Sequence, residues 1–600
     1  MKIFYMICAL LVVCSSFLRG QDNILISSKQ VSNSAEYSKG ILRKSKAYTS
    51  VDFVEINMDK ILDYDEFVLQ IDGRSIPIRK ERIDAKGVNA YVFVGSNEKD
   101  NHVLISVLDN DIQGVVETDD EVFTIETVGK HQYALLTVDY SALTEACGEL
   151  EVENDYSSAF DISSGEAPGV TTVNDNEKAM SPILKSASLH DCKIRVLVLY
   201  TSSAHSAVSN MKNTIQTAIA LTNQSFINSQ INYQIELVYA GLTDYTESGF
   251  STDLLRFRTS DDGYMDEVHA LRNKYSADVC VLLIDDCEYC GLATAIGVPE
   301  DKAFCAVSIC STCATTNYSF GHEIGHLLGC RHDPYVDSRT TPFAYGHGYV
   351  APSNTWRTIM AYRNACGSCP RLLYWSNPNV IYNGEPIGTI ATNDNTRVWN
   401  ERSNTVMAFR QPDNDVTFAS SDMPNTQYAD IIAKNNIITS GTVNVNNGNT
   451  LNMRAGNSII LQPGFSVQSG AEFSVEIENI DGCGECASNV SNVIIQKVSE
   501  EYDERTENQI EEKSDFSYKV FPDVSNECIT IIYSIKIEMP LSIDLVNLFG
   551  KKIKTILPKQ KQQSGDYTLQ IPISIFSTGT YFLNISSNNQ INTEKIVINK

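Results

Sequence analysis

The chain has 600 residues, of which 74 are acidic and 47 are basic, so its formal net charge at pH 7 is −27. This charge argues against a nucleic-acid-binding protein, which would carry basic stripes, and favours a soluble chain that self-repulsion keeps monomeric. Hydrophobic residues make up 42% of the chain, enough for several cores, which excludes wholesale disorder. The 16 cysteines are too few for a small disulfide-built scaffold and too many for a typical cytosolic protein without a redox role.

The first 20 residues have the layout of a secretory signal peptide. Lys2 precedes an apolar run at 3–13, and small or polar residues follow as far as Gly20. The run is shorter than the roughly 20 apolar residues that cross a bilayer, so a membrane anchor is the less favoured alternative. No later segment has 18 uninterrupted apolar residues, which predicts a mature chain without a transmembrane segment. Export makes disulfide bonds possible.

The rest of the chain alternates between β-rich and α/β patterns. Short strand-like runs such as 66–71 and 102–107, separated by turn residues, predict an antiparallel β-rich domain, which a polar, acidic linker follows. The continuous apolar run 194–200 predicts a strand buried on both faces, and residues 204–229 have helical periodicity. Alternating strands and helices predict an α/β layer fold with a mostly parallel sheet. Two all-β regions end the chain, the second of them a β-sandwich.

One helical segment carries histidines in a metal-binding pattern. His322 and His326 are four residues apart, so both imidazoles lie on one face of a helix, and Glu323 follows the first of them. Gly329 can end the helix in a conformation that other residues avoid, and the turn then returns His332 as a third ligand. Three histidines and an open fourth position are typical of a catalytic zinc site. We expect zinc to activate water, with Glu323 as the general base.

A helix with incidental histidines is the alternative interpretation of this segment. With 9 His and 33 Gly in the chain, three His and one Gly at these fixed offsets arise by chance in about 1 of 10,000 such sequences. The pattern therefore favours a metal site. The remaining histidines, among them His205, His269 and His347, are expected to be surface or core residues.

The pattern His-Glu-x-x-His-x-x-Gly-x-x-His resembles the metzincin zinc proteases. That family has a methionine turn beneath the metal, and Met360, in the run Thr-Ile-Met-Ala-Tyr, matches it. Asp333 after the third histidine is similar to the reprolysin (adamalysin) branch, and the run 374–378 resembles its secreted bacterial relatives, the peptidyl-Asp metalloendopeptidases. The resemblance covers about residues 190–411. It implies an α/β catalytic domain, a mixed twisted sheet with helices and the zinc site at an interdomain cleft.

The same resemblance implies an edge strand that aligns the substrate. The run Tyr-Cys-Gly-Leu-Ala at 289–293 matches the family's pattern, which assigns Gly291, Leu292 and Ala293 to that strand. A peptide substrate would pair with this edge as an added strand. Arg363 and Arg371, which follow the methionine turn, could bind an acidic substrate side chain.

The last 85 residues resemble the sorting domain of Gram-negative proteins exported by the type IX pathway. The matching segments are 518–522, 544–550, 577–582 and 595–600, although the family's opening Pro-Asn-Pro is Pro-Asp-Val here. The resemblance implies the type IX machinery as a partner and export through the periplasm to the exterior or the cell surface. A β-sandwich that binds a surface glycan or protein is the alternative.

The cysteines support export and suggest a control of activity. Ten of them lie between residues 192 and 369, and an even number in an exported domain predicts disulfide bonds of open connectivity. Structural zinc held by the Cys-x-x-Cys pairs that begin at Cys287, Cys310 and Cys366 is the alternative. Cys147, followed by a glycine, could replace the catalytic water on zinc, the cysteine switch known in several metzincin branches. A disulfide with Cys192 and an inert thiol are the alternatives.

These observations predict a secreted zinc endopeptidase that is made as a zymogen and acts on protein or peptide substrates. A non-catalytic surface adhesin and a hydrolase of small amides are the rival functions. Calcium could bind at acidic residues such as Asp285 and Asp286, but no loop has the spacing of a calcium site. The predicted order is a signal peptide at 1–20, a β-rich propeptide with its acidic linker at 21–190, a metzincin catalytic domain at 191–411, a linker and β-repeat module at 412–480, an acidic linker at 481–515 and a β-sandwich sorting domain at 516–600.

Overall fold

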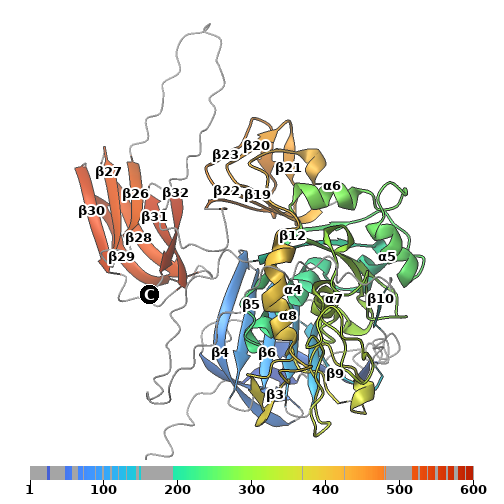
Figure 1. Cartoon of the computed structure of the whole chain (residues 1–600). Helices are drawn as coiled ribbons and strands as arrows, with labels where there is room; N and C mark the ends of the chain where they lie inside the picture. Colours follow the sequence, from blue (N-terminus) through green and yellow to red (C-terminus); the bar gives the residue numbers. More distant parts are fainter. Residues whose placement is uncertain are drawn as a thin grey trace, which may run out of the picture. The chain divides into compact units, whose positions relative to one another are not determined.

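The computed structural model of the chain describes residues 23–27, most of 47–149, most of 193–480 and most of 516–598 (Figure 1). The predicted signal peptide, the acidic linker before residue 193 and the linker at 481–515 lie outside the described residues. The chain forms two compact units, and the second of them contains the C-terminal strands. Among the helices of the described part, none is long and apolar enough to cross a membrane.

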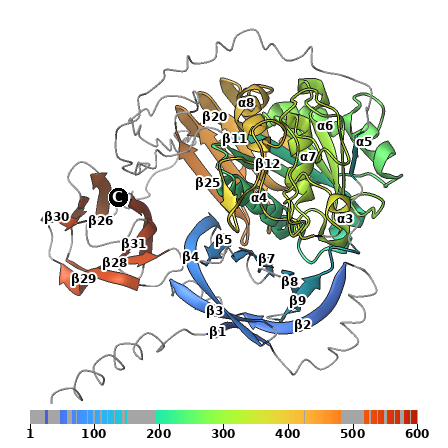
Figure 2. The same ribbon diagram turned by 60° about the horizontal axis from the view of Figure 1, so that its bottom comes forward.

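The N-terminal strands close into a barrel, in the order β1-β2-β9-β8-β7-β6-β5-β4-β3. One apolar set, which includes Phe67, Phe93 and Phe123, forms a core of its own. The other set, which includes Leu104 and Val115, shares a core with helix α4 of the α/β region, and Figure 2 shows the barrel beside that helix. The β-rich prediction is confirmed, with closure into a barrel as the new feature. The strands are β1 (Asn23–Ser27), β2 (Tyr48–Ile56), β3 (Glu66–Ile71), β4 (Arg74–Gly87), β5 (Ala90–Ser96), β6 (His102–Leu108), β7 (Asp111–Glu117), β8 (Val122–Gly129) and β9 (Gln132–Val138).

The α/β region is built on a mostly parallel sheet, as the sequence predicts. Strands β11, β12, β13 and β15 pair in parallel, and the short strand β14 pairs antiparallel with β15. Both faces of these strands are covered, by α4 and α7 on one side and by α5 and α6 on the other, which explains their continuous apolar sequences. The strands are β11 (Lys193–Tyr200), β12 (Gln234–Leu242), β13 (Val279–Ile284), β14 (Gly291–Ala293) and β15 (Phe304–Ser308).

The helices depart from the prediction at one point. Residues 204–229 were expected to be one helix, but the chain breaks at 208–210, where the side chain of Asn210 accepts a hydrogen bond from the backbone N–H of Asn213 and begins a new helix. The predicted break near 261–263 separates α5 from α6. The helices are α3 (Ser202–Ala207), α4 (Met211–Asn228), α5 (Phe250–Arg258), α6 (Glu267–Lys274), α7 (Ser319–Leu328) and α8 (Asn395–Met407).

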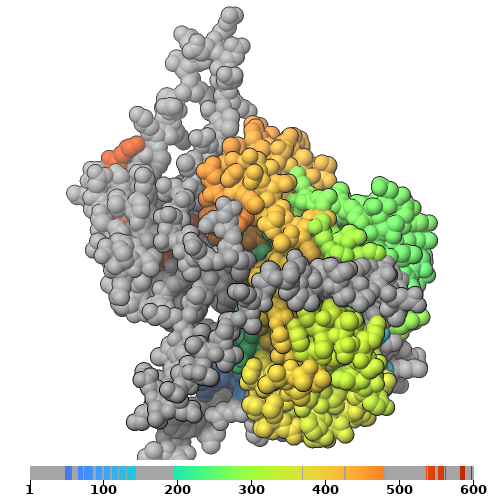
Figure 3. Space-filling view, in the orientation of Figure 1, coloured from blue at the N-terminus to red at the C-terminus, as the bar shows by residue number. Residues whose placement is uncertain are grey.

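Residues 415–477, here called the β-module, form parallel ladders that pair residues 22 positions apart, for example Tyr428 with Thr450 and Thr450 with Glu472. The stretch expected to be a linker before this module contains its first strand, β18. Strand β19 pairs antiparallel with β12, so the module extends the α/β sheet, and Figure 3 shows the two regions sharing a continuous surface. The strands are β18 (Asp415–Ala419), β19 (Thr426–Ala433), β20 (Asn436–Ser440), β21 (Val443–Val445), β22 (Thr450–Ala455), β23 (Ser458–Ile460), β24 (Phe465–Val467) and β25 (Glu472–Ile477).

The C-terminal strands form the predicted β-sandwich. A three-stranded sheet in the order β26-β27-β30 and a four-stranded sheet in the order β29-β28-β31-β32 share an apolar core that includes Ile531, Leu541 and Leu583. All the described pairings are antiparallel. The strands are β26 (Phe516–Asp523), β27 (Cys528–Ile535), β28 (Met539–Asn547), β29 (Lys552–Gln562), β30 (Gly565–Pro572), β31 (Gly579–Ser587) and β32 (Gln590–Ile598).

Candidate active site

The three predicted histidine ligands converge at the end of α7. His322 and His326 lie on one face of this buried helix, which ends at Gly329 with φ of 122°. The turn that follows brings His332 back, so that its Nε2 atom lies 3.2 Å from Nε2 of His322 and 3.0 Å from Nε2 of His326. The glycine supplies a backbone conformation that other residues rarely adopt. The local sequence therefore builds the cluster.

The donor set fits a zinc ion. Nδ1 of His322 contacts the carbonyl oxygen of Ile359 at 3.0 Å, and Nδ1 of His326 contacts that of Cys330 at 2.8 Å, so both Nδ1 atoms carry the proton and both Nε2 lone pairs face the cluster. Burial lowers the pKa of His322 and of His332, which keeps both imidazoles neutral. Two nitrogens bound to one tetrahedral zinc lie about 3.3 Å apart, close to the spacing observed here.

His332, the predicted third ligand, contacts two residues that the sequence analysis did not assign to the site. The ring of Tyr362 stacks on the His332 ring with centroids 4.3 Å apart, and its backbone N–H donates to Oδ2 of Asp333 at 2.8 Å. Nδ1 of His347 contacts the carbonyl oxygen of His332 at 2.7 Å, and His347 is buried. Tyr362 lies in the Met-turn motif and could have been noticed there, whereas no local pattern marks His347.

Met360 lies in a fully buried turn beneath α7. The turn is closed by a hydrogen bond from the N–H of Ala361 to the carbonyl of Thr358, and the N–H of Ile359 donates to the carbonyl of Tyr374. A methyl group on Gly325 would lie 3.4 Å from the Met360 sulfur, so the turn packs directly against the helix that carries two of the histidines. Met360 therefore packs against the helix that carries two of the predicted ligands.

Cys147 lies within the histidine cluster, although it is 175 positions before His322 in the chain. Its Sγ atom is 3.4 Å from Nε2 of His326 and 3.1 Å from Oε1 of Glu323, and all the ligand atoms of Cys147, His322, His326 and His332 lie within 4.8 Å of one another. Cys147 is a thiol in this structure. Its predicted alternative partner, Cys192, lies outside the described residues.

Cys147 begins a short strand that lies on the predicted substrate edge. Strand β10 (Cys147–Glu149) pairs in parallel with β14, residue by residue from Cys147 opposite Gly291. The hydroxyl of Tyr362 accepts from the backbone N–H of Cys147 at 2.8 Å and donates to its carbonyl at 3.0 Å. A methyl group on Gly291 would overlap the carboxylate of Glu323, so the edge strand and the predicted general base are in direct contact.

The cysteines of the α/β region are only partly paired. Disulfides join Cys287 to Cys310, Cys290 to Cys313 and Cys366 to Cys369, and the first two fix the segment that leads into β14. Three others, Cys280, Cys305 and Cys330, are buried thiols. The even number of cysteines predicted more disulfide bonds than the structure contains among its described residues, because buried cysteines also serve as small apolar core residues. Cys280 and Cys305, for example, belong to the cores on opposite faces of the sheet.

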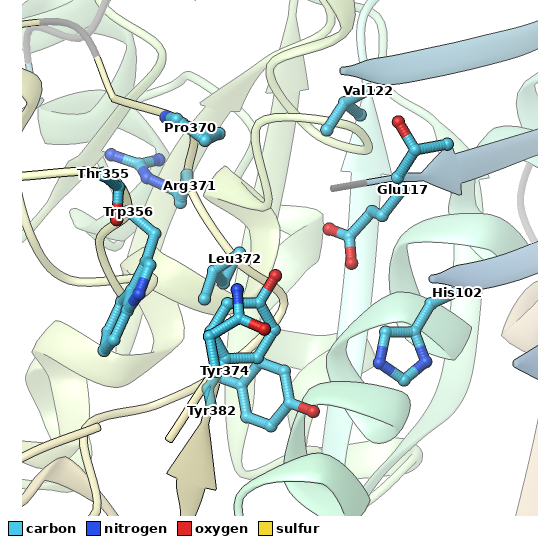
Figure 4. Close-up of a pocket in the computed structure, with 12 residues that line it drawn as sticks. His102, Glu117, Val122, Thr355, Trp356, Pro370, Arg371, Leu372, Tyr374 and Tyr382 are labelled. Atoms are coloured by element: carbon cyan, nitrogen blue, oxygen red, sulfur yellow. The ribbon is translucent and has the colours of Figure 1, made fainter. Parts of the chain in front are cut away.

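The barrel contacts the α/β region across a small cavity of about 70 Å³ (Figure 4). Glu117 of β7 faces this cavity, and its Oε1 accepts a hydrogen bond from the hydroxyl of Tyr318, the residue before α7. Burial raises the pKa of Glu117 to about 7, against the opposing effect of this hydrogen bond. A carboxyl group with a raised pKa is therefore part of the contact between the two regions.

The two predicted acid-binding arginines have different surroundings. Nη1 of Arg363 donates to the carbonyls of Tyr140 and Ser141, in the turn that follows the barrel, at 2.7 Å each. Arg371 is almost fully buried, and its Nη1 donates to the carbonyl of Asn317 at 2.7 Å. Arg363 therefore contacts the turn that follows the barrel, whereas Arg371 lies in the protein interior.

Comparison with known proteins agrees with this geometry. Residues 190–376 match metallo-peptidase family M12. A peptidyl-Asp metalloendopeptidase from Stenotrophomonas maltophilia (strain R551-3) is 40% identical over 344 residues, which span 56% of this chain and 78% of that protein. The chain belongs to the peptidyl-Asp metalloendopeptidase family. A family member from Xanthomonas campestris pv. campestris is 35% identical over 405 residues, which span 64% of this chain and 92% of its own. The protein is thus a zinc metalloendopeptidase.

The other matches concern the fold and the C-terminus. The crystal structure of metalloproteinase-II from Bacteroides fragilis aligns with 49% of this chain and 85% of its own at 11% identity, with a TM-score of 0.28. Residues 519–599 match the secretion system C-terminal sorting domain. This metalloendopeptidase is therefore exported by the type IX route to the cell surface or the exterior.

Proposed function

We propose that His322, His326 and His332 bind the catalytic zinc and that Glu323 is the general base of peptide-bond hydrolysis. The observation that carries this proposal is the convergence of the three Nε2 atoms beside the Glu323 carboxylate. Zinc, when bound, lowers the pKa of a water molecule to about 7 and polarises the substrate carbonyl. Glu323 accepts the proton of the attacking water and then donates it to the leaving amine. The substrate pairs with β14, in the position that β10 occupies in this structure.

The protein is made as a zymogen in which the N-terminal barrel and β10 act as the propeptide. Two contacts support this step of the proposal. The Cys147 thiol occupies the position beside Glu323 that the catalytic water needs, and β10 occupies the edge of β14 that a substrate strand needs. Cleavage between residues 149 and 193 would release both contacts together.

The substrates are proteins that are cut at an acidic residue. The relatives are named for aspartate, and an arginine beside the Met-turn would supply the positive charge that such a side chain requires. Casein and a panel of unfolded proteins are suitable test substrates. The positions of the cuts identify the residue that is recognised.

The general base is tested with Glu323→Ala in the processed, zinc-loaded enzyme. General acid–base catalysis contributes about 10²–10⁴-fold, so casein hydrolysis should fall by that factor. Asp301→Ala, which removes an exposed carboxylate on the same region, serves as the matched control and should leave the rate unchanged. A wild-type protein that releases no peptide from any unfolded protein at neutral pH would favour an adhesin, and one that hydrolyses only small amides would favour an amidase.

Latency is tested with Cys147→Ser in the full-length protein, purified before any processing. This variant should hydrolyse casein faster than the wild-type zymogen, because a serine hydroxyl is a poor zinc ligand. Ser141→Ala, in the exposed turn before the switch, is the control. Alkylation gives a second readout, since the wild-type thiol should react only after zinc is chelated. A Cys147→Ser zymogen as inactive as the wild type would show that another contact maintains latency.

A further inference from the structure

Arg371 is a buried cation to which no carboxylate in the described part of the chain is ion-paired. Its exposed fraction is 2%, and its Nε atom has no hydrogen-bond acceptor. Arg331, which is similarly buried, forms an ion pair of 2.8 Å with Asp337. Burial of a guanidinium without an opposing charge is unfavourable, so Arg371 is a position where a carboxylate from another molecule would be stabilised.

The hydrogen bonds of Arg371 leave one edge of its guanidinium available. Nη1 donates to the carbonyl of Asn317 at 2.7 Å and to Oδ1 of the same residue at 3.2 Å. Nη2 has only a contact of 3.5 Å with the carbonyl of Ala361. The Nε–H and one Nη2–H of an arginine point the same way, with the spacing of the two oxygens of a carboxylate. This edge can therefore bind an aspartate side chain with two parallel hydrogen bonds.

The position of Arg371 relates it to the proposed zinc site. Asn317 lies two residues before α7, and Ala361 directly follows Met360 of the Met-turn. The guanidinium thus lies between the start of the helix that carries two zinc ligands and the turn beneath them. Figure 4 shows it pointing away from Glu117, so the carboxyl group that the barrel contributes is not its counterpart.

The turn that precedes β10 covers this region in the zymogen. Tyr140 is buried, and its hydroxyl lies 3.5 Å from the backbone carbonyl of Arg371. Arg363 binds the carbonyls of Tyr140 and Ser141 and is half-buried. Loss of this turn uncovers the approach to both arginines, but only Arg371 is held in place by the protein interior. A preorganised charge of low exposure discriminates more strongly between a carboxylate and a neutral group.

We infer that Arg371 is the specificity-determining residue that binds the carboxylate of the substrate aspartate. The inference rests on the proposed function of the neighbouring zinc site. It assigns Arg363 to the contact with the N-terminal segment, and it predicts that the enzyme selects aspartate by charge as well as by size.

The test compares two peptides that differ only in Asp or Asn at the cleaved position, a nearly isosteric pair. The ratio of kcat/KM for Asp over Asn is measured for the processed wild type, Arg371→Gln, Arg371→Lys, Arg363→Gln and Arg402→Gln. Arg402 is a matched control, because it is a buried arginine on α8 that donates to a backbone carbonyl, that of Val298. Arg371→Gln should lower the ratio at least about 100-fold while hydrolysis of the Asn peptide changes little. Arg363→Gln and Arg402→Gln should retain the wild-type ratio.

Several outcomes would overturn the inference. These are an unchanged ratio in Arg371→Gln, a collapse of the ratio in Arg363→Gln instead, or an equal loss of both activities, which would indicate a structural role. If Arg371→Gln does not fold, Arg371→Lys carries the test, and its ratio must fall at least about tenfold. Binding of the two peptides to Glu323→Ala, with and without Arg371→Gln, separates recognition from catalysis. A wild-type protein that cuts neither peptide nor casein would instead refute the proposed function.

Discussion

Gly325 gives a quantitative test of how tightly the Met-turn and the helix that carries His322 and His326 are packed. A methyl group at this position, between His322 and His326, would lie 2.7 Å and 2.8 Å from two carbon atoms of Trp375. Protein Cβ atoms do not approach other atoms this closely, so Gly325→Ala must displace the indole or the helix by several tenths of an ångström. The indole is fully buried, donates from Nε1 to the Ser225 hydroxyl at 2.8 Å and packs against Trp399 at 5.0 Å.

The expected cost follows from three effects. Overpacking of a closed core costs about 1–3 kcal/mol. Replacement of glycine by alanine within a helix stabilises the folded state by about 1 kcal/mol, and a weakened Trp375–Ser225 hydrogen bond destabilises it by about 1 kcal/mol. The net destabilisation of Gly325→Ala is about 2 kcal/mol, which lowers the unfolding temperature of a domain of this size by about 4–8 °C. Misplacement of the two histidines relative to His332 should also reduce casein hydrolysis, by up to about tenfold.

The assay pairs thermal unfolding with casein hydrolysis and uses Gly321→Ala as the control. Gly321 lies on the same helix, but a methyl group there would lie 3.0 Å from the hydroxyl oxygen of Thr222, a smaller overlap that the gain in helix propensity offsets. Gly321→Ala should therefore unfold within about 2 °C of the wild type. If Gly325→Ala unfolds no earlier than Gly321→Ala and is fully active, the packing argument is refuted.

Three further substitutions follow from the structure. Gly291→Ala should abolish casein hydrolysis without lowering the unfolding temperature, because its methyl group displaces the Glu323 carboxylate; an active variant would contradict this. Burial raises the pKa of Glu117 from 4.5 to about 7, which favours the protonated folded form, so the full-length protein should lose stability as pH rises from about 4.5 to 7. Glu117→Gln should reduce this slope in unfolding at pH 5–7, to which other buried carboxyl groups with raised pKa, such as Glu126 and Asp278, also contribute, and an unchanged slope would refute the assignment. Arg454→Met should destabilise the β-module by about 3–5 kcal/mol in urea unfolding, because it leaves the buried carboxylate of Asp430 without its ion-pair partner. An unchanged free energy of unfolding would contradict this.

The sequence predicts the parts of the site that depend on local geometry. The spacing of His322 and His326 and the glycine that ends their helix are sufficient to place two of the proposed ligands on one face and to return His332 beside them. His347 could not be assigned a role, because it contacts His332 from a separate segment and no periodicity marks it. Arg371 was a candidate for binding an acidic side chain, but its burial and its hydrogen bond to Asn317 required the structure. The position of Cys147 beside the cluster was predicted from its isolation in the chain and from the family resemblance, and its pairing with β14 required the structure.

The fold shows the same division between local and long-range information. The parallel sheet follows from alternating strands and helices, whose periodicities are local. Closure of the barrel and the antiparallel pairing of β19 with β12 depend on contacts between distant segments. The stretch expected to be a linker contains β18 because its partner, β20, lies about 20 residues further along the chain.

The nine-stranded sheet, with β10 at one margin and the β-module at the other, bears on the solubility of the enzyme. An open strand edge in a parallel sheet is a template for aggregation. The β12 edge is covered by β19, and Arg454 reinforces that cover through its ion pair of 3.0 Å with Glu236. The proposed function requires the β14 edge, by contrast, to exchange one strand for another, first β10 and then the substrate. An enzyme truncated before β18 would expose the edge of β12 and should aggregate.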